Sequence, residues 1–318
     1  MEDHPPPDNW PVVSVCITTC NRAGYVAEAV DSALAQSYRS LEIVVVDDAS
    51  DDGTSAVLSE YTDPRIRVFR NTRRLGQARN RNHAVATARG ELVKFLDDDD
   101  VLEPDCVAEM ATLFRSDPRV GLAFCRRKVL VAEGADAFAE VVIRKYSNLH
   151  LGFDRLETVT DGRALLTQWV DGGMRENWIG EPSAVMVRKD LLARSDGFSD
   201  HIRHIVDLDL WVRLMANTHV GFVDRELVHY RTGHAGVTQS NYATGRTWLD
   251  RLWMLENLAQ AVDVSPYPKV ADALRAERRS VWRTVAKFGR TSDGRRLPVA
   301  PYRHYLLARV RRGIGLRT

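Results

Sequence analysis

The sequence lacks the features that would place it inside a membrane or outside the cell. Of its 318 residues, no apolar run approaches the roughly 18 that a membrane-spanning helix needs. The polar, proline-rich residues 1–11 have no apolar centre like that of a secretion signal. Four cysteines are too few and too scattered for a disulfide framework. We therefore expect a cytoplasmic protein whose cysteines pack in a reduced interior.

Overall charge is also nearly absent, but its distribution is uneven. The formal net charge is +1, yet residues 271–318 hold 13 Lys/Arg against 3 Asp/Glu, which leaves −9 for the rest. Such a basic tail is typical of contact with an anionic surface. It has two alternative interpretations: an interfacial helix at the inner face of the membrane, or a helical extension that packs on the core or on a second subunit of a homodimer. We expect no nucleic-acid partner.

Internal repeats are absent too, and the order of apolar segments indicates the fold class. Short apolar runs alternate with stretches of helical periodicity, which favours an α/β fold with a right-handed, mostly parallel sheet flanked by helices. We predict strands at 12–18, 41–46, 66–70, 92–96, 120–124, 128–132 and 183–187, and edge strands at 220–223 and 227–230. The pattern is helical from 247 onward. We divide the chain into an extended N-terminus at 1–11, an α/β domain at 12–240 and a helical, basic C-terminal region at 241–318.

Four consecutive aspartates, Asp97 to Asp100, follow the apolar run that ends at Leu96. Carboxylates this dense repel one another and resist burial, so packing does not explain them. One interpretation is a solvated turn that caps the helix after Pro104. The other is a divalent-metal site, because Mg²⁺ and Mn²⁺ prefer oxygen ligands and open α/β sheets bind ligands at the carboxyl ends of their strands.

Five segments in order resemble the family 2 glycosyltransferases, inverting enzymes with the nucleotide-sugar-binding fold called GT-A. They are Val13–Arg22, Glu42–Thr54, Gly76–Asn80, Phe95–Asp100 with Pro104, and Asp207–Leu214. The resemblance covers about three quarters of the chain. It implies a nucleoside-diphosphate-sugar donor, with UDP as the expected nucleotide, and a divalent metal, Mn²⁺ or Mg²⁺. It also implies a glycan or lipid-linked acceptor and a role in polysaccharide biosynthesis.

The resemblance assigns the nucleotide pocket to residues near the ends of the first strands. Asp48 would accept a hydrogen bond from the base, although a turn or helix-cap role is the alternative for it and Asp47. Arg79 would contact the base or the diphosphate. It could instead be a surface arginine, since Arg73, Arg74 and Arg81 offer the same chemistry. The loop residues expected in the pocket are Thr18, Thr19 and Asn21.

Within the acidic run, the family's D-x-D pattern falls on Asp97–Asp99. By resemblance Asp97 faces the ribose and the metal, Asp98 contacts the donor sugar, and Asp99 binds the metal that bridges the diphosphate. Asp100 would tighten the site or cap the next helix. Later in the chain, Arg231 would meet the diphosphate and His234 the metal.

Asp207 matches the family's general base, which takes the proton of the attacking acceptor hydroxyl. Its alternative role is a helix cap, and Asp209 would be a cap or a support. Val206 stands where many relatives have glutamate. For the acceptor, we expect Trp178 to stack on a sugar ring beside Glu181, while a core tryptophan is the competing interpretation.

Two rival functions remain. A sugar-nucleotide pyrophosphorylase would carry a glycine-rich phosphate loop after the first strand, where this chain has Thr18–Arg22. A non-catalytic glycan- or nucleotide-binding module derived from a transferase would have no need of a base, and Asp207 is present.

Overall fold

The computed structural model describes residues 11–131, 143, 147–232 and 247–287. Its first half contains β1 (Val13–Thr19), α1 (Val26–Leu34), β2 (Leu41–Asp47), α2 (Thr54–Ser59), β3 (Ile66–Arg70), α3 (Gln77–Thr87), β4 (Leu92–Asp97), β5 (Val101–Leu102), α4 (Cys106–Ser116) and β6 (Val120–Val131). The second half contains the 3-10 turn η1 (Leu149–Gly152), β7 (Val159–Asp161), α6 (Gly162–Asp171), the 3-10 turn η2 (Pro182–Ala184), β8 (Val185–Arg188), α7 (Lys189–Arg194), α8 (Val206–Met215), β9 (His219–Thr232), α10 (Thr247–Ala261) and α11 (Pro268–Lys287).

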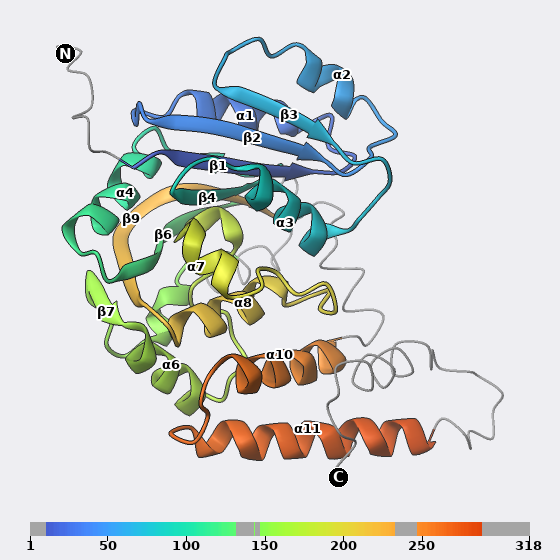
Figure 1. The fold of residues 1–318 in the computed structure, drawn as a ribbon, viewed down its shortest axis with the longest axis vertical. Helices are drawn as coiled ribbons and strands as arrows, with labels where there is room; N and C mark the ends of the chain where they lie inside the picture. The colour runs from blue at the N-terminus through green and yellow to red at the C-terminus, as the bar shows by residue number, and fades with distance from the viewer. Residues whose placement is uncertain (1–10, 132–142, 144–146, 233–246, 288–318) are drawn as a thin grey trace.

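In the described residues the strands form one nine-stranded sheet in the order β3-β2-β1-β4-β8-β6-β9-β5, with β7 paired to β9 (Figure 1). The pairs among β1, β2, β3 and β4 are parallel, and β8 joins both β4 and β6 in antiparallel fashion. The predicted mixed, mostly parallel sheet flanked by helices is confirmed.

Two predictions about the later strands are wrong. The segments 120–124 and 128–132 belong to one strand, β6, and 220–223 with 227–230 belong to β9. Polar residues interrupt both apolar patterns, and the β6–β9 register shifts beside Arg126, where irregular pairing accommodates them. β9 is also not an edge strand, because it pairs with β5, β6 and β7.

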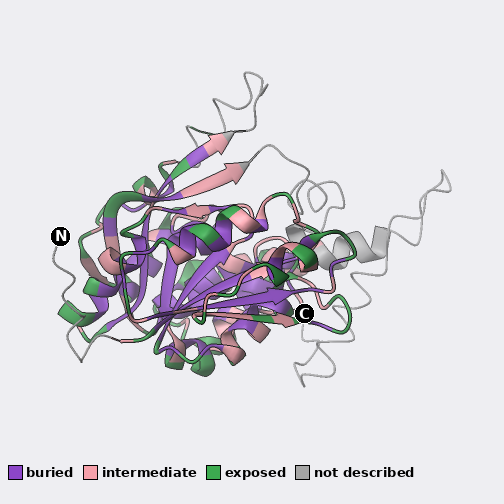
Figure 2. Ribbon diagram, turned by 90° about the horizontal axis from the view of Figure 1, so that it is seen from above, coloured by how far each residue is buried: buried purple, intermediate pink, exposed green. Residues whose placement is uncertain are grey.

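Hydrophobic cores lie on both faces of the sheet. One core joins β1 and β2 to α1 and α4, and the other joins the opposite face to α3, α6, α7, α8 and α10. The central strands are buried on both sides (Figure 2), which explains why they read as continuous apolar runs. Val270 and Leu274 extend the second core, so the start of α11 packs against the body of the protein.

The first strands end together at one edge of the sheet. Thr19 lies opposite Asp47 and Thr18 lies opposite Asp97 in the parallel register. The polar residues that follow β1, β2 and β4 are therefore neighbours in space.

Candidate active site

Asp48, directly after β2, is held at the start of α3. Its carboxylate accepts hydrogen bonds from the amides of Leu75 and Gly76, 2.7 and 2.8 Å away, and from the Asn71 side chain at 2.8 Å. Gly76 has φ +86°, a conformation that glycine adopts without strain. This arrangement ties Asp48 to the turn before α3, and its contact with a base stays a prediction.

Asp47 and Asp52, on either side of Asp48 in the sequence, stabilise turns of the backbone. The Asp47 carboxylate accepts from the Ser50 amide at 3.0 Å, and Asp52 accepts from the Thr54 amide at 2.9 Å at the start of α2. Asn21, whose amide bonds Ser50 Oγ at 2.9 Å, joins the β1 loop to the same turn. These contacts fix the shape of the loops that follow β1 and β2.

The structure separates the candidate arginines of α3. Arg79 turns away from the acidic residues and pairs with Asp200 at 2.6 Å. Arg81, two residues on and therefore on the opposite side of the helix, is buried and donates to Asp97 Oδ1 at 2.6 Å. Arg81 is therefore the α3 arginine that the fold brings to the turn formed by Asp97–Asp100, the acidic turn.

The four aspartates that begin with the last residue of β4 form a tight turn that is closed by a hydrogen bond from the Asp100 amide to the Asp97 carbonyl, 3.2 Å. Burial raises the pKa of Asp98 to about 7, and the charge of Asp99 adds to the shift. Burial also raises the pKa of Asp100 well above its usual range, with Asp97 as the next cause. The turn therefore holds more negative charge than its protein environment stabilises.

Arginine side chains offset part of this charge. Arg22 lies 3.6 Å from Asp98 and 3.7 Å from Asp99. Arg231, at the end of β9, donates from its amide to Asp100 at 2.9 Å and from Nε to the Asp99 carbonyl at 3.0 Å. Arg231 thus contacts the four aspartates, its contact with a diphosphate stays a prediction, and His234 lies outside the described residues.

A divalent cation fits the donor set of this turn by its chemistry. Asp97 and Asp99 supply the carboxylate oxygens that hard cations prefer. Among the residues that the structure describes, no three His, Cys, Asp or Glu side chains converge on one point. The carboxylates of Asp97 and Asp99 instead face Arg81 and Arg22.

Asp207 lies in the first turn of α8, as predicted. Burial raises its pKa above the usual aspartate range, and Arg81 is a positive charge near enough to lower it in part. Asn177 donates from Nδ2 to Asp207 Oδ2 at 2.9 Å. Because the same amide group also bonds the carbonyl and the amide of Gly180, Asn177 fixes the Asp207 carboxylate against the preceding loop.

Asp209 has a different role from Asp207. Its buried carboxylate pairs with Arg213 at 2.7 Å and accepts from Asn257 of α10 at 2.8 Å. This agrees with its predicted supporting role, because the contacts tie α8 to α10.

The two expected acceptor residues are strongly held by protein contacts. Trp178 packs edge-on against Phe153, with ring centroids 5.1 Å apart, and a Cβ added to Gly172 would lie 2.2 Å from its ring. Glu181 pairs with Arg127 at 2.8 Å, and burial raises its pKa. The contacts of Trp178 favour the core interpretation, and the acceptor role of both residues stays a prediction.

Comparison with known proteins identifies the family. The model for "Glycosyl transferase family 2" matches residues 14–167, and the uncharacterized Mycobacterium tuberculosis protein MT1568 is 39% identical over 76% of this chain and 73% of its own. The chain belongs to glycosyltransferase family 2.

Solved structures confirm the GT-A fold of this family 2 glycosyltransferase. S. aureus TarS, residues 1–349 in complex with UDP-GlcNAc, superimposes with a TM-score of 0.64 at 18% identity, covering 88% of this chain and 76% of that one. The mannosyltransferase PcManGT from Pyrobaculum calidifontis, in complex with GDP-Man and Mn²⁺, gives 0.58 at 19% identity, covering 94% and 80%. No helix in the described ranges is both long and apolar enough to cross a membrane.

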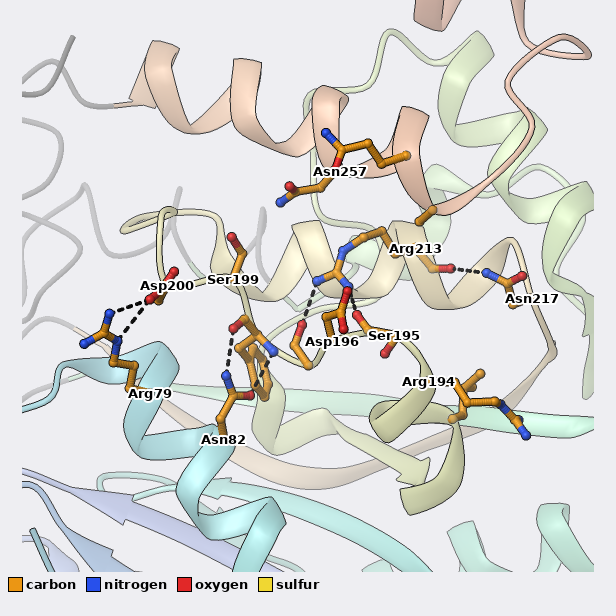
Figure 3. Close-up of a pocket in the computed structure, with 15 residues that line it drawn as sticks. Arg79, Asn82, Arg194, Ser195, Asp196, Ser199, Asp200, Arg213, Asn217 and Asn257 are labelled. Atoms are coloured by element: carbon orange, nitrogen blue, oxygen red, sulfur yellow. Dashed lines mark hydrogen bonds and ion pairs between the residues drawn. The ribbon is translucent and has the colours of Figure 1, made fainter. Parts of the chain in front are cut away.

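A cavity of about 1050 Å³ lies between α3 and α10 (Figure 3). It is lined by Arg79, so it opens on the side of α3 that faces away from the acidic turn. Its arginines are paired within the protein: Arg79 with Asp200, Arg194 with Asp190 and Arg213 with Asp209. The positive charge of this lining is therefore balanced by carboxylates of the protein.

Sequence reasoning did not find Asn177, Lys94 and Ser183, or the contact of Arg22 with the acidic turn. Asn177 contacts the predicted base, while Lys94 and Ser183 lie directly behind the acidic turn. The lysine carried a signal, because a charged residue within an otherwise apolar strand is rarely buried without a partner. Asn177 and Ser183 are ordinary polar residues in loops, and only their spatial neighbours give them a role.

Proposed function

We propose that this protein is an inverting glycosyltransferase that moves a sugar from a nucleoside-diphosphate donor, with UDP as the expected nucleotide, to a hydroxyl of a glycan or lipid-linked acceptor. The observation that carries the proposal is the joint placement of Asp207 and the acidic turn. Arg81 connects them, since it bonds Asp97 and its charge also acts on Asp207. A base is thereby held next to a group of carboxylates suited to a diphosphate–metal complex.

The residues divide the work of an in-line displacement. Asp97 and Asp99 would hold a divalent cation, whose charge offsets the negative charge that the diphosphate gains as the sugar leaves. Asp207 accepts the proton of the acceptor hydroxyl as its oxygen attacks the anomeric carbon. Asn177 keeps the Asp207 carboxylate oriented for this step. Arg22 and Arg231, which both contact Asp99, would bind the phosphate oxygens.

The C-terminal region bears on how the acceptor is reached. Val270 and Leu274 are buried against the body, while Arg275 and Arg279 on the same helix are exposed. Packing on the core therefore holds for the first turns of α11. Peripheral contact of the exposed basic face with an anionic membrane, and homodimer formation, are compatible with this arrangement.

Donor binding is tested by calorimetry with UDP, GDP and dTDP, each with Mn²⁺ and with a chelator. We expect one nucleotide to bind only with Mn²⁺, and binding to be lost in Asp99→Asn but retained in Asp263→Asn, a matched change of an aspartate in the loop between α10 and α11. Absence of nucleotide binding in the presence of metal would contradict the proposal.

Catalysis is tested separately, because a non-catalytic binding module would also bind the donor. The wild type should slowly hydrolyse the sugar conjugate of the nucleotide that binds. Asp207→Asn should bind that donor normally and hydrolyse it at least about 100-fold more slowly, the range expected for loss of a general base. Equal hydrolysis by the two proteins would favour the non-catalytic alternative.

A further inference from the structure

Lys94 is a lysine in the interior of β4 with no exposed surface. A buried ammonium group is costly unless its hydrogen-bonding capacity is satisfied. Its Nζ donates to the carbonyl of Phe95 at 2.8 Å and to the carbonyl of Ser183 in η2. Lys94 thus joins the end of β4 to the segment that enters β8.

Ser183 carries this connection to the acidic turn. Its buried hydroxyl accepts a hydrogen bond from the Asp97 amide at 2.9 Å and donates one to the Asp100 carboxylate. The serine therefore bonds both the first and the last residue of the four-aspartate turn. Movement of η2 would displace the turn at both ends.

We propose that Lys94 is a positioning residue that acts through Ser183 to hold the acidic turn in the geometry that binds a divalent cation. The inference rests on the proposed function, because it assumes that the turn binds metal. Residues behind the direct ligands of a metal typically change its affinity 10- to 100-fold when they are replaced. Ser183 bonds the backbone amide of Asp97, one of the two residues assigned to the cation, and Lys94 bonds Ser183.

A lysine that only fills space predicts a different result. Methionine has a similar length and no charge, so Lys94→Met preserves most of the packing while removing both hydrogen bonds. If Lys94 served packing alone, the folded variant would bind metal as the wild type does. If it positions the turn, metal affinity falls even where the protein stays folded.

The experiment measures Mn²⁺ affinity by calorimetry in wild type, Lys94→Met, Ser183→Ala and the double variant, with circular dichroism to verify folding. Lys189→Met is the matched control, because Lys189 Nζ also donates to a backbone carbonyl, that of Ala88, at the other end of β8. We expect each single change to weaken binding about 10-fold, the double variant to be no weaker than the weaker single variant, and the control to be unchanged.

Wild-type affinity in folded Lys94→Met would overturn the inference, as would effects that multiply in the double variant. If Lys94→Met does not fold, Ser183→Ala tests the inference instead. Unchanged Mn²⁺ affinity in Ser183→Ala would show that Lys94 does not act on the acidic turn through Ser183. Absence of Mn²⁺ binding by the wild type would refute the metal site of the proposed function, and the inference with it. Normal wild-type binding with unaffected variants would refute the inference alone.

Discussion

Replacing Asn177 with alanine should move the acid limb of the pH–rate profile to higher pH. The Asn177 amide donates to Asp207 at 2.9 Å and stabilises the ionised carboxylate. Burial already raises the pKa of Asp207, so loss of this donor raises that pKa further. Because the base acts in its ionised form, the rate falls as the pH drops through its pKa, and a higher pKa shifts this fall upward.

The size of the shift follows from the contact. A hydrogen bond to a charged group contributes about 1.5–3 kcal/mol, and one pKa unit corresponds to about 1.4 kcal/mol. Asp207 is partly exposed, so water replaces some of the lost stabilisation. We therefore expect a shift of about one unit. At a pH well above both limbs, the rates of the two proteins should converge.

The assay is donor hydrolysis measured across the acid range for wild type and Asn177→Ala. Asn257→Ala is the control, because Asn257 makes the same amide–carboxylate contact at 2.8 Å with Asp209 on the same helix. The control should lose stability without moving the limb. An unmoved limb in Asn177→Ala, or an equal shift in Asn257→Ala, would refute the reasoning.

Two further substitutions test the frame of the site through urea unfolding. Arg213→Met leaves the Asp209 carboxylate buried without its cation and should lower the free energy of unfolding by about 3–5 kcal/mol, whereas a change below 1 kcal/mol would contradict a buried ion pair. Gly180→Ala places a Cβ 1.9 Å from the Arg127 guanidinium, at a residue whose φ is +115°. It should lower the free energy of unfolding by about 2 kcal/mol or more. Unchanged stability would show that this loop can relax.

The sequence predicted elements best where chemical signals marked both ends. β3 at Ile66–Arg70 has the predicted bounds. β6 was predicted as two strands because Arg126 and Arg127 interrupt its apolar pattern. The long pairing with β9 carries the strand through that interruption, and a single-sequence pattern contains no information about the partner strand.

The candidate site also has residues that the sequence predicts and residues that only the fold identifies. The run of four aspartates could be predicted as a candidate metal site from the sequence alone, and Asp207 was predicted from the family segment Asp207–Leu214. The roles of Asn177 and Lys94 depend on partners 30 and 89 residues away, so spacing along the chain gave no signal. The choice between Arg79 and Arg81 was set by which side of α3 faces the sheet, which the weak apolar periodicity of this helix left open.

The contacts of Arg231 have a consequence for the order in which the protein matures during synthesis. This side chain bonds Glu28, 203 residues earlier, as well as the Asp99 carbonyl, so it joins the first helix to the acidic turn. A ribosome adds about 5–20 residues per second. The parallel strands β1 to β4 therefore leave the ribosome several seconds before the end of β9 does. A nascent chain has the aspartates long before it has the arginine that bonds Asp99 and Asp100, so we expect the acidic turn to reach its final arrangement only after β9 has emerged.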